Sequence, residues 1–73
     1  MYKIGDTVKH YKGNYYQIIG FATHTETLEE LIIYRPYNIV DNIAETKFWA
    51  RPKSMFDENV NGVKRFTLVE KKQ

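Results

Sequence analysis

The feature that most limits the fold of this chain is a ten-residue run, from Tyr15 to His24, with apolar residues on both faces. Alternate residues of a strand share a face. Gly20 lies inside the run, and a glycine within a strand is typical of a bulge or a bend. The run therefore predicts a long strand that turns a corner in a small barrel. One face would carry Tyr15, Ile19 and Phe21, and the other Tyr16, Ile18 and Ala22.

The size of the chain predicts one small domain, residues 1–73. It has 73 residues and no cysteine, and a domain of this size buries only about 60% of the surface that its unfolded form exposes. Large catalytic clefts, dinucleotide-binding folds and α/β barrels are excluded by length. Hydrophobic residues make up 42% and charged residues 27% of the chain, which is typical of a folded domain.

Shorter strand patterns surround the long run. Residues 7–11 alternate polar with β-branched or aromatic side chains, and residues 12–14 predict a turn in which Gly13 and Asn14 adopt positive φ. Residues 25–30 predict a polar connection. Residues 31–35 predict a third strand that ends at Pro36, because proline cannot donate a ladder hydrogen bond. Residues 37–46 predict a long loop.

The rest of the chain predicts a fourth strand at residues 47–51 and then one helical or 3₁₀ turn at residues 52–56, with Pro52 in its first position. Asn61-Gly62, between two valines, predicts a tight hairpin. Residues 65–69 predict the last strand, and residues 70–73 a frayed end.

These elements together predict the fold class. Five or six short strands and one brief helical turn cannot form a two-layer sandwich in so short a chain. Closing one strongly bent sheet removes its exposed edges. We therefore expect an all-β fold, an SH3-like small, strongly bent barrel of five to six strands, with an OB-type barrel as the alternative.

Several short blocks follow one another between positions 9 and 66: residues 10–16 (HYKGNYY), 22–31 (ATHTETLEEL), 33–34 (IY), 49–52 (WARP), 55–58 (MFDE) and 65–66 (RF). Their order and spacing resemble those of the bacterial and phage domain-of-unknown-function 1653 family. The loop at residues 37–46 looks longer or differently composed than in the family, and Lys64 stands where a proline is common. The resemblance implies a fold similar to SH3-type barrels, and it implies no activity and no catalytic residue.

Charge is unevenly distributed along the chain. Residues 26–45 contain five acids and one base, a net of −4, whereas the remainder contains ten bases and four acids, a net of +6. Such a chain is typically a soluble protein with mixed charges, but a basic face for a phosphate-bearing partner or head-to-tail self-association would also fit. No run approaches the roughly 20 apolar residues that span a bilayer, and no secretory signal is evident. We expect a cytoplasmic protein without membrane contact.

His24 and Glu26 form the first candidate constellation. Two residues apart on an extended chain, they share a face, so the carboxylate could orient the imidazole. The alternative is a loop-ordering motif, in which Glu26 and Thr27 cap the next turn and His24 packs against an aromatic ring. A pair of His10 with His24 is not expected, since a straight strand of about 33 Å would separate them.

Metal binding and nucleophilic catalysis have little support in the sequence. A metal site would need three ligands from His10, His24, Glu26 and the acids at positions 57 and 58, and these lack ligand-type spacing. The only serine, Ser54, has no histidine near it in the sequence. We therefore assign no metal, no cofactor and no catalytic residue.

Aromatic and basic residues are interleaved along the chain. Small barrels that bind nucleotides or single strands combine rings for stacking with cations for phosphate, and peptide-binding barrels use similar aromatic grooves. A small barrel also needs large side chains in its core, so about half of these aromatics are expected to be structural. The interleaved set is Tyr11, Tyr15, Tyr16, Tyr34, Tyr37, Phe48 and Trp49 with Lys9, Lys12, Arg35, Lys47, Arg51 and Lys53.

The leading hypothesis is a non-enzymatic binding module for a compact anionic or phosphate-bearing ligand of nucleotide type, which could act by sequestration. Long nucleic acid is not expected, because a net charge of +2 is weak for a protein that must neutralise many phosphates. In this hypothesis the ligand stacks on Tyr11, Tyr34 or Trp49, its charge meets Lys12 and Arg51, and a polar edge of it bonds His24 and Glu26.

Two alternatives stay open. One is a protein-interaction module or homodimeric adaptor that uses the acidic segment at residues 26–45 and the long loop. The other is a small hydrolase in which His24 acts as the base and Glu26 orients it.

Overall fold

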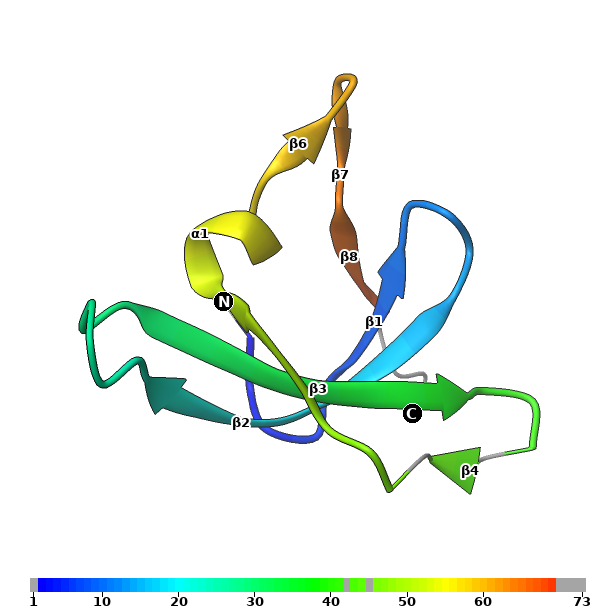
Figure 1. Cartoon of the computed structure of the whole chain (residues 1–73). Helices are drawn as coiled ribbons and strands as arrows, with labels where there is room; N and C mark the ends of the chain where they lie inside the picture. Colours follow the sequence, from blue (N-terminus) through cyan, green and yellow to red (C-terminus); the bar gives the residue numbers. More distant parts are fainter. Residues whose placement is uncertain (1, 42, 45, 70–73) are drawn as a thin grey trace.

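The computed structural model describes residues 2–41, 43–44 and 46–69, and the expected frayed end at residues 70–73 lies outside them. Strands make up most of the described elements, and the all-β prediction is confirmed (Figure 1). In chain order the elements are β1 (Thr7–His10), β2 (Tyr15–Thr23), β3 (Glu30–Asn38), β4 (Ile43–Ala44), β5 (Trp49–Pro52), α1 (Lys53–Phe56), β6 (Asn59–Val60), β7 (Val63–Lys64) and β8 (Phe66–Val69).

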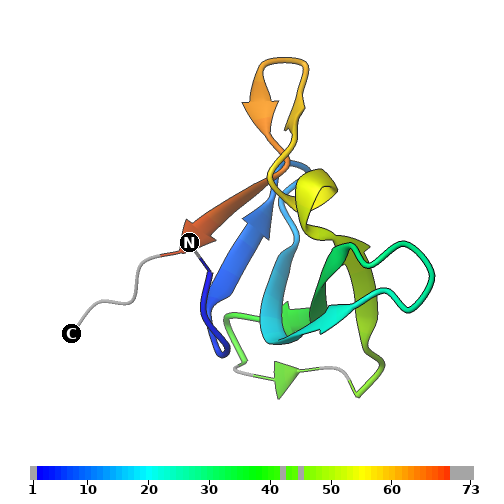
Figure 2. The same cartoon turned by 90° about the vertical axis from the view of Figure 1, so that its left-hand side faces the viewer.

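One bent antiparallel sheet forms the body of the molecule. Its strand order is β4-β3-β2-β1-β8, and β5 pairs with the edge of β3 opposite to β2. Figure 2 shows the sheet as a curve with β8 and β1 on one side and β5 on the other, and with α1 above it. The strands β6 and β7 form a separate hairpin that projects from this body. The barrel-like sheet matches the expected bent barrel, and the more specific likeness to SH3-type barrels stays a prediction.

A bulge bends the long strand β2 where Gly20 predicted it. The register between β2 and β3 shifts between Ile18 and Gly20. Residues directly opposite each other point to the same face of a sheet. Phe21 lies opposite the buried Ile32 and therefore shares the face of Ile18, not that of Tyr15. The expected alternation fails beyond the bulge because one extra residue reverses the faces.

Strand β3 runs through Pro36 instead of ending before it. Pro36 lies opposite Tyr16 of β2. On the other edge of β3, β5 pairs up to Tyr34 and β4 pairs from Tyr37 onward. Proline is tolerated at this position because no described strand pairs with it on that edge. The segment predicted as a long loop therefore contributes the end of β3 and the strand β4.

The other boundaries differ only slightly from the predicted ones. Strand β1 ends one residue earlier, β5 covers residues 49–52, and β8 begins at residue 66. Pro52 precedes the helix as its N-cap residue, with φ −54° and ψ 138°, instead of occupying the first helical position. It keeps this extended conformation because it still pairs with Leu31 of β3.

Both predicted turns are present. Asn61 and Gly62 have φ of 52° and 81°, the combination that a two-residue hairpin of type I′ requires. In the turn before β2, Gly13 has the expected positive φ of 103°, whereas Asn14 does not. One residue with positive φ is sufficient there because the N–H of Gly13 closes the turn on the carbonyl of His10 at 2.8 Å.

The core is small and strongly aromatic. Phe56 of α1 stacks on Phe66 of β8, with ring centroids 4.0 Å apart, and this contact joins the helix to the strand that pairs with β1. Tyr2 and Tyr16 pack against the core from outside. Among the described residues, the buried hydrophobic side chains are those of Val8, Ile18, Ile32, Tyr34, Phe56 and Phe66.

Candidate functional site: a cationic cluster beside aromatic rings

His10, the last residue of β1, is half-buried among aromatic rings. Its ring centroid lies 4.5 Å from that of Tyr11, 5.1 Å from that of Phe66 and 6.3 Å from that of Tyr16. Its Nδ1 accepts a hydrogen bond from the backbone N–H of Lys12 at 3.1 Å. The neutral imidazole therefore carries its proton on Nε2, which can donate to a further group.

Three cations surround this imidazole. Burial, followed by the positive charges of Arg51, Arg65 and Lys12, lowers the pKa of His10 from its ordinary value of 6.5. Nearby like charges lower a pKa in this way because they disfavour the protonated form. Side chains from the turn before β2, from β5 and from the residue before β8 thus converge on one place. We call His10, Lys12, Arg51 and Arg65 the cationic cluster.

Tyr34 holds Arg51 in this cluster. The Tyr34 hydroxyl accepts a hydrogen bond from Arg51 Nε at 3.2 Å, and the guanidinium lies 5.9 Å from the centroid of the Phe66 ring. Only 2% of Tyr34 is exposed, so it belongs to the core and offers no face on which a ligand could stack. Its place in the site is to support Arg51, not to stack as the sequence had suggested.

Arg65 is a member of the cluster that reasoning from the sequence missed. Its Nη2 pairs with the carboxylate of Glu58, while its buried Nε has no hydrogen-bond partner among the described residues. A buried donor without an acceptor costs about 1–3 kcal/mol. The sequence did contain a signal that could have pointed to Arg65, since Arg65 and Phe66 form one of the family-like blocks. In the structure Phe66 pairs with His10 across β1 and β8, and this pairing places Arg65 near the cluster.

Two exposed rings flank the cationic cluster. Tyr11 is 41% exposed and Trp49 is 43% exposed. The Nζ of Lys12 lies 5.9 Å from the centroid of the Tyr11 ring, and the Trp49 ring lies 5.9 Å from that of Tyr16. Of the predicted site residues, the structure gathers these at the cluster: Tyr11, Lys12, Tyr34, Trp49 and Arg51.

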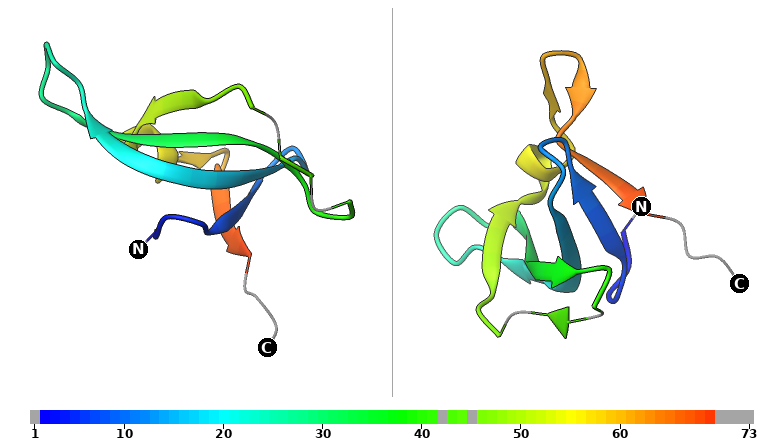
Figure 3. Two further views of the ribbon diagram at one scale, coloured as in Figure 1. Left: turned by 90° about the horizontal axis from the view of Figure 1, so that it is seen from below. Right: turned by 90° about the vertical axis from the view of Figure 1, so that its right-hand side faces the viewer.

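His24 and Glu26 lie elsewhere, in the turn between β2 and β3, at the opposite end of β2 from Lys12. The left view of Figure 3 shows this turn reaching away from the rest of the molecule. His24 Nδ1 accepts hydrogen bonds from the backbone N–H groups of Glu26 at 3.1 Å and Thr27 at 3.3 Å. In the described residues the Glu26 carboxylate does not bond the imidazole. This geometry agrees with the loop-ordering alternative more than with a carboxylate-oriented base.

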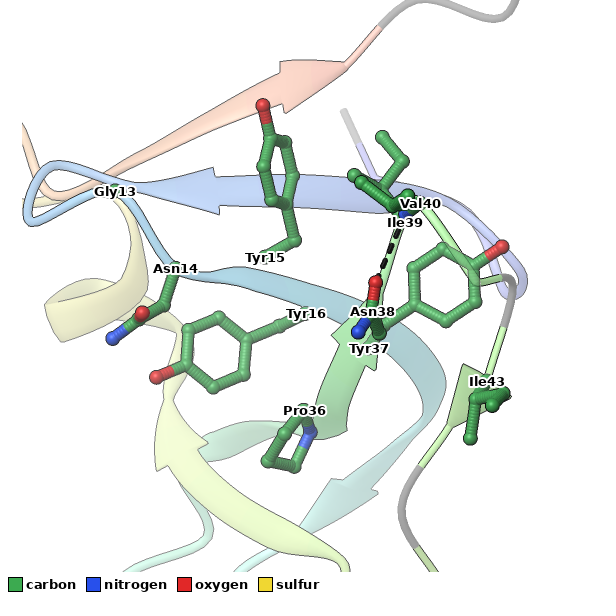
Figure 4. Close-up of a pocket in the computed structure, with 10 residues that line it drawn as sticks. All are labelled: Gly13, Asn14, Tyr15, Tyr16, Pro36, Tyr37, Asn38, Ile39, Val40 and Ile43. Carbon is green, nitrogen blue, oxygen red and sulfur yellow. Dashed lines mark hydrogen bonds between the residues drawn. The ribbon is translucent and has the colours of Figure 1, made fainter.

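A hollow of about 580 Å³ opens next to the cationic cluster. The pairing of β2 with β3 ends at Tyr16 and Pro36, and β3 then pairs with β4. The two strands diverge there and leave the hollow between them (Figure 4). Its lining consists of Gly13, Asn14, Tyr15, Tyr16, Pro36, Tyr37, Asn38, Ile39, Val40 and Ile43.

A family model described as "protein of unknown function (DUF1653)" matches residues 6–68. The chain belongs to this family. The match contains the blocks between positions 9 and 66, so membership of the domain-of-unknown-function 1653 family is confirmed. No curated protein and no solved structure matches the chain. Membership of a family of unknown function assigns no role to any residue.

Two further observations concern the part of the chain that the structure describes. It contains no helix long and apolar enough to cross a membrane. It also contains no group of three or more histidine, aspartate or glutamate side chains that could hold a metal ion.

Proposed function

We propose that this member of the domain-of-unknown-function 1653 family is a non-enzymatic module that binds a compact, phosphate-bearing ligand of nucleotide type at the cationic cluster. The observation that carries the proposal is the position of Arg51, which Tyr34 holds beside the Phe66 ring, close to His10 and to the turn of Lys12. Burial and the positive charges of Arg51, Arg65 and Lys12 lower the pKa of His10. Glu58 already pairs with Arg65, whereas no carboxylate pairs with Lys12 or Arg51 in the described residues. A bound anion would relieve the repulsion that remains between these cations.

Lys12, Arg51 and His10 have donors to offer. The Nε of Arg51 bonds Tyr34, and this leaves the outer edge of the guanidinium for a phosphate oxygen. The Nε of Arg65 is buried and Arg65 Nη2 pairs with Glu58, so Arg65 contributes its charge and not this Nε–H. His10 adds its Nε2–H. The exposed ring of Trp49 borders the cluster and offers a face against which the ribose of the ligand can pack.

The surroundings of His10 support binding more than turnover. A general base needs an orienting partner and a reacting group within hydrogen-bond reach. In the described structure His10 Nδ1 receives a backbone N–H instead of facing a carboxylate. We therefore propose a module that sequesters its ligand, in the cytoplasm of a bacterium or of a phage-infected cell.

A thermal-shift screen with ribose 5-phosphate and the nucleoside 5′-monophosphates as probes tests the proposal. A ligand at 100 times its Kd stabilises the native state by about 2.7 kcal/mol, which raises the Tm of so small a domain by several degrees. Calorimetric titration of the probe with the largest shift then compares the wild type with Lys12→Ala and Arg51→Lys. Each variant is expected to weaken binding by about tenfold or more, because each loses a charge-assisted hydrogen bond.

Two control variants accompany these. Lys3→Ala removes the same charge as Lys12→Ala at an exposed position outside the cluster, and Glu26→Gln tests the turn between β2 and β3. Both are expected to bind like the wild type. The proposal is wrong if no phosphate-bearing probe shifts the Tm, or if Lys12→Ala and Arg51→Lys bind as tightly as the wild type.

A protein-interaction module or homodimeric adaptor is the second candidate, and the turn between β2 and β3 favours it. This turn carries Leu28, which is 75% exposed, between the exposed acids Glu26 and Glu29. Glu45, another member of the acidic segment, lies outside the described residues. A hydrodynamic mass above that of one chain, or protein partners that survive nuclease treatment, would favour this candidate over the first.

A further inference from the structure

We infer that the hollow between the diverging strands β2 and β3 receives the planar base of a nucleotide whose phosphate lies on the cationic cluster. The inference rests on the proposed function and deepens it, since it assigns a second subsite. It also gives the base of the nucleotide-type ligand a place of its own in the fold, separate from the place of the phosphate.

The shape of the hollow follows from the topology. Beyond Tyr16 and Pro36 the strands β2 and β3 no longer pair, so a hollow that is broadly open to solvent lies between the start of one and the end of the other. Its volume of about 580 Å³ lies within the range of about 300–1,000 Å³ that small-molecule sites occupy. The side chains around it are mostly aromatic or aliphatic (Figure 4). Such a lining suits an aromatic ring better than a sugar or a free phosphate.

Tyr16 and the turn before β2 lie between the hollow and the cationic cluster. The Tyr16 ring lines the hollow and lies 6.3 Å from the ring of His10. Gly13 and Asn14 also line it, and they directly follow Lys12 of the cluster. A molecule with a ring in the hollow can therefore reach the cations with a short linking group, and ribose is a group of that kind.

Of the two asparagines that line the hollow, one is engaged in hydrogen bonds and the other is available. Asn38 Oδ1 accepts hydrogen bonds from the backbone N–H groups of Val40 at 3.0 Å and Asp41 at 3.1 Å. This side chain therefore holds the turn between β3 and β4. The exposed Asn14 amide makes no side-chain hydrogen bond within the described residues, and Figure 4 shows it at the rim beside Tyr16. An amide presents a donor and an acceptor together, which matches the edge of a base.

Calorimetry with three probes tests the inference: ribose 5-phosphate, adenosine and adenosine 5′-monophosphate. We expect the monophosphate to bind at least about tenfold more tightly than ribose 5-phosphate, because only the former fills both subsites. Ile43→Trp places a large ring in the hollow and should reduce the affinity for adenosine 5′-monophosphate to that for ribose 5-phosphate. Its affinity for ribose 5-phosphate should be unchanged. Asn14→Ala should weaken the binding of adenosine 5′-monophosphate and leave the binding of ribose 5-phosphate unchanged.

Val63→Trp is the matched control, because Val63 also lies on a two-residue strand and is 55% exposed, against 61% for Ile43. It should bind all probes like the wild type. Equal affinities for ribose 5-phosphate and adenosine 5′-monophosphate would overturn the base subsite and leave the cationic site standing. So would full affinity of Ile43→Trp for the monophosphate. Absence of binding by every phosphate-bearing probe would overturn both.

Discussion

At the scale of single residues, His10 determines how the candidate site is charged. Its Nδ1 is occupied by the N–H of Lys12, and two arginines and a lysine lie near it. The folded protein therefore favours the neutral imidazole, which leaves the positive charge of the site to the arginines and the lysine. Protonation would add one more cation to a place that already holds three.

The stability of the protein should consequently fall in acid. The unfolded chain binds a proton at His10 near the ordinary pKa of 6.5, and the folded chain binds it only at lower pH. The contribution of His10 to the free energy of unfolding is thus complete above pH 6.5 and is lost as the pH falls from there through the folded pKa. Urea denaturation of the wild type and of His10→Asn at several pH values measures this contribution.

The asparagine side chain in the His10→Asn variant keeps an acceptor for the N–H of Lys12 but does not titrate. The difference in free energy of unfolding between the two proteins should therefore shrink as the pH falls. A difference that stays constant with pH would show that His10 titrates alike in both states.

Leu28 is a second residue with a consequence for stability. Its φ is 63° and 75% of it is exposed. The left-handed conformation costs a residue with a side chain about 1–3 kcal/mol, whereas glycine adopts it freely. Leu28→Gly should raise the free energy of unfolding by about 1 kcal/mol after the added chain entropy of glycine is counted. Leu28→Ala keeps the Cβ atom and should change the free energy of unfolding little. Equal denaturation midpoints for the two variants would count against backbone strain at this position.

At the scale of elements, two glycines differ in whether their backbone conformation requires glycine. Gly62 has a φ of 81°, whereas Gly20 has no positive φ, and a Cβ atom added there would have no neighbour within 4 Å. Gly62→Ala should lower the free energy of unfolding by about 1 kcal/mol or more, because alanine is strained in the hairpin turn. Gly20→Ala should leave it unchanged or raise it by about 0.4–1 kcal/mol.

Urea denaturation of Gly62→Ala and Gly20→Ala measures the change in the free energy of unfolding of each variant. A loss at Gly20 as large as that at Gly62 would mean that the bulge of β2 requires glycine. The expected result would mean that the β2–β3 register alone produces the bulge. Gly20 would then have marked the position of the bulge without being its cause.

At the scale of the whole molecule, a small core limits stability. A domain of this length is stable by about 4–11 kcal/mol, and one stacked pair, Phe56 with Phe66, joins α1 to β8. Phe56→Ala should lower the free energy of unfolding by about 3–5 kcal/mol, which lowers the Tm of a domain of this size by more than about 10 °C. Phe56→Leu keeps most of the buried volume and should remain folded. Thermal melts followed by circular dichroism distinguish these outcomes, and a folded, stable Phe56→Ala protein would contradict the importance of this contact.

Features that arise from a few neighbouring residues could be predicted from the amino-acid sequence. The hairpin at Asn61-Gly62 could be predicted because both residues tolerate positive φ, and the bend of the long strand could be predicted from Gly20. The all-β class followed from the density of such signals. The ends of the strands were predicted less accurately. Pro36, for example, ends a strand only if a partner needs its N–H, and local sequence does not say where partners lie.

Which side chains form the candidate site depends on contacts between distant parts of the chain. Arg65 joins the cluster because β8 pairs with β1 and brings Phe66 opposite His10, a contact between distant parts of the chain. The same closure buries Tyr34 in the core and leaves His24 at the far end of β2. Residue types had indicated a basic and aromatic surface. Its composition depended on how the sheet closes, because the free energy of closure comes from the packing of the whole core and not from any one segment.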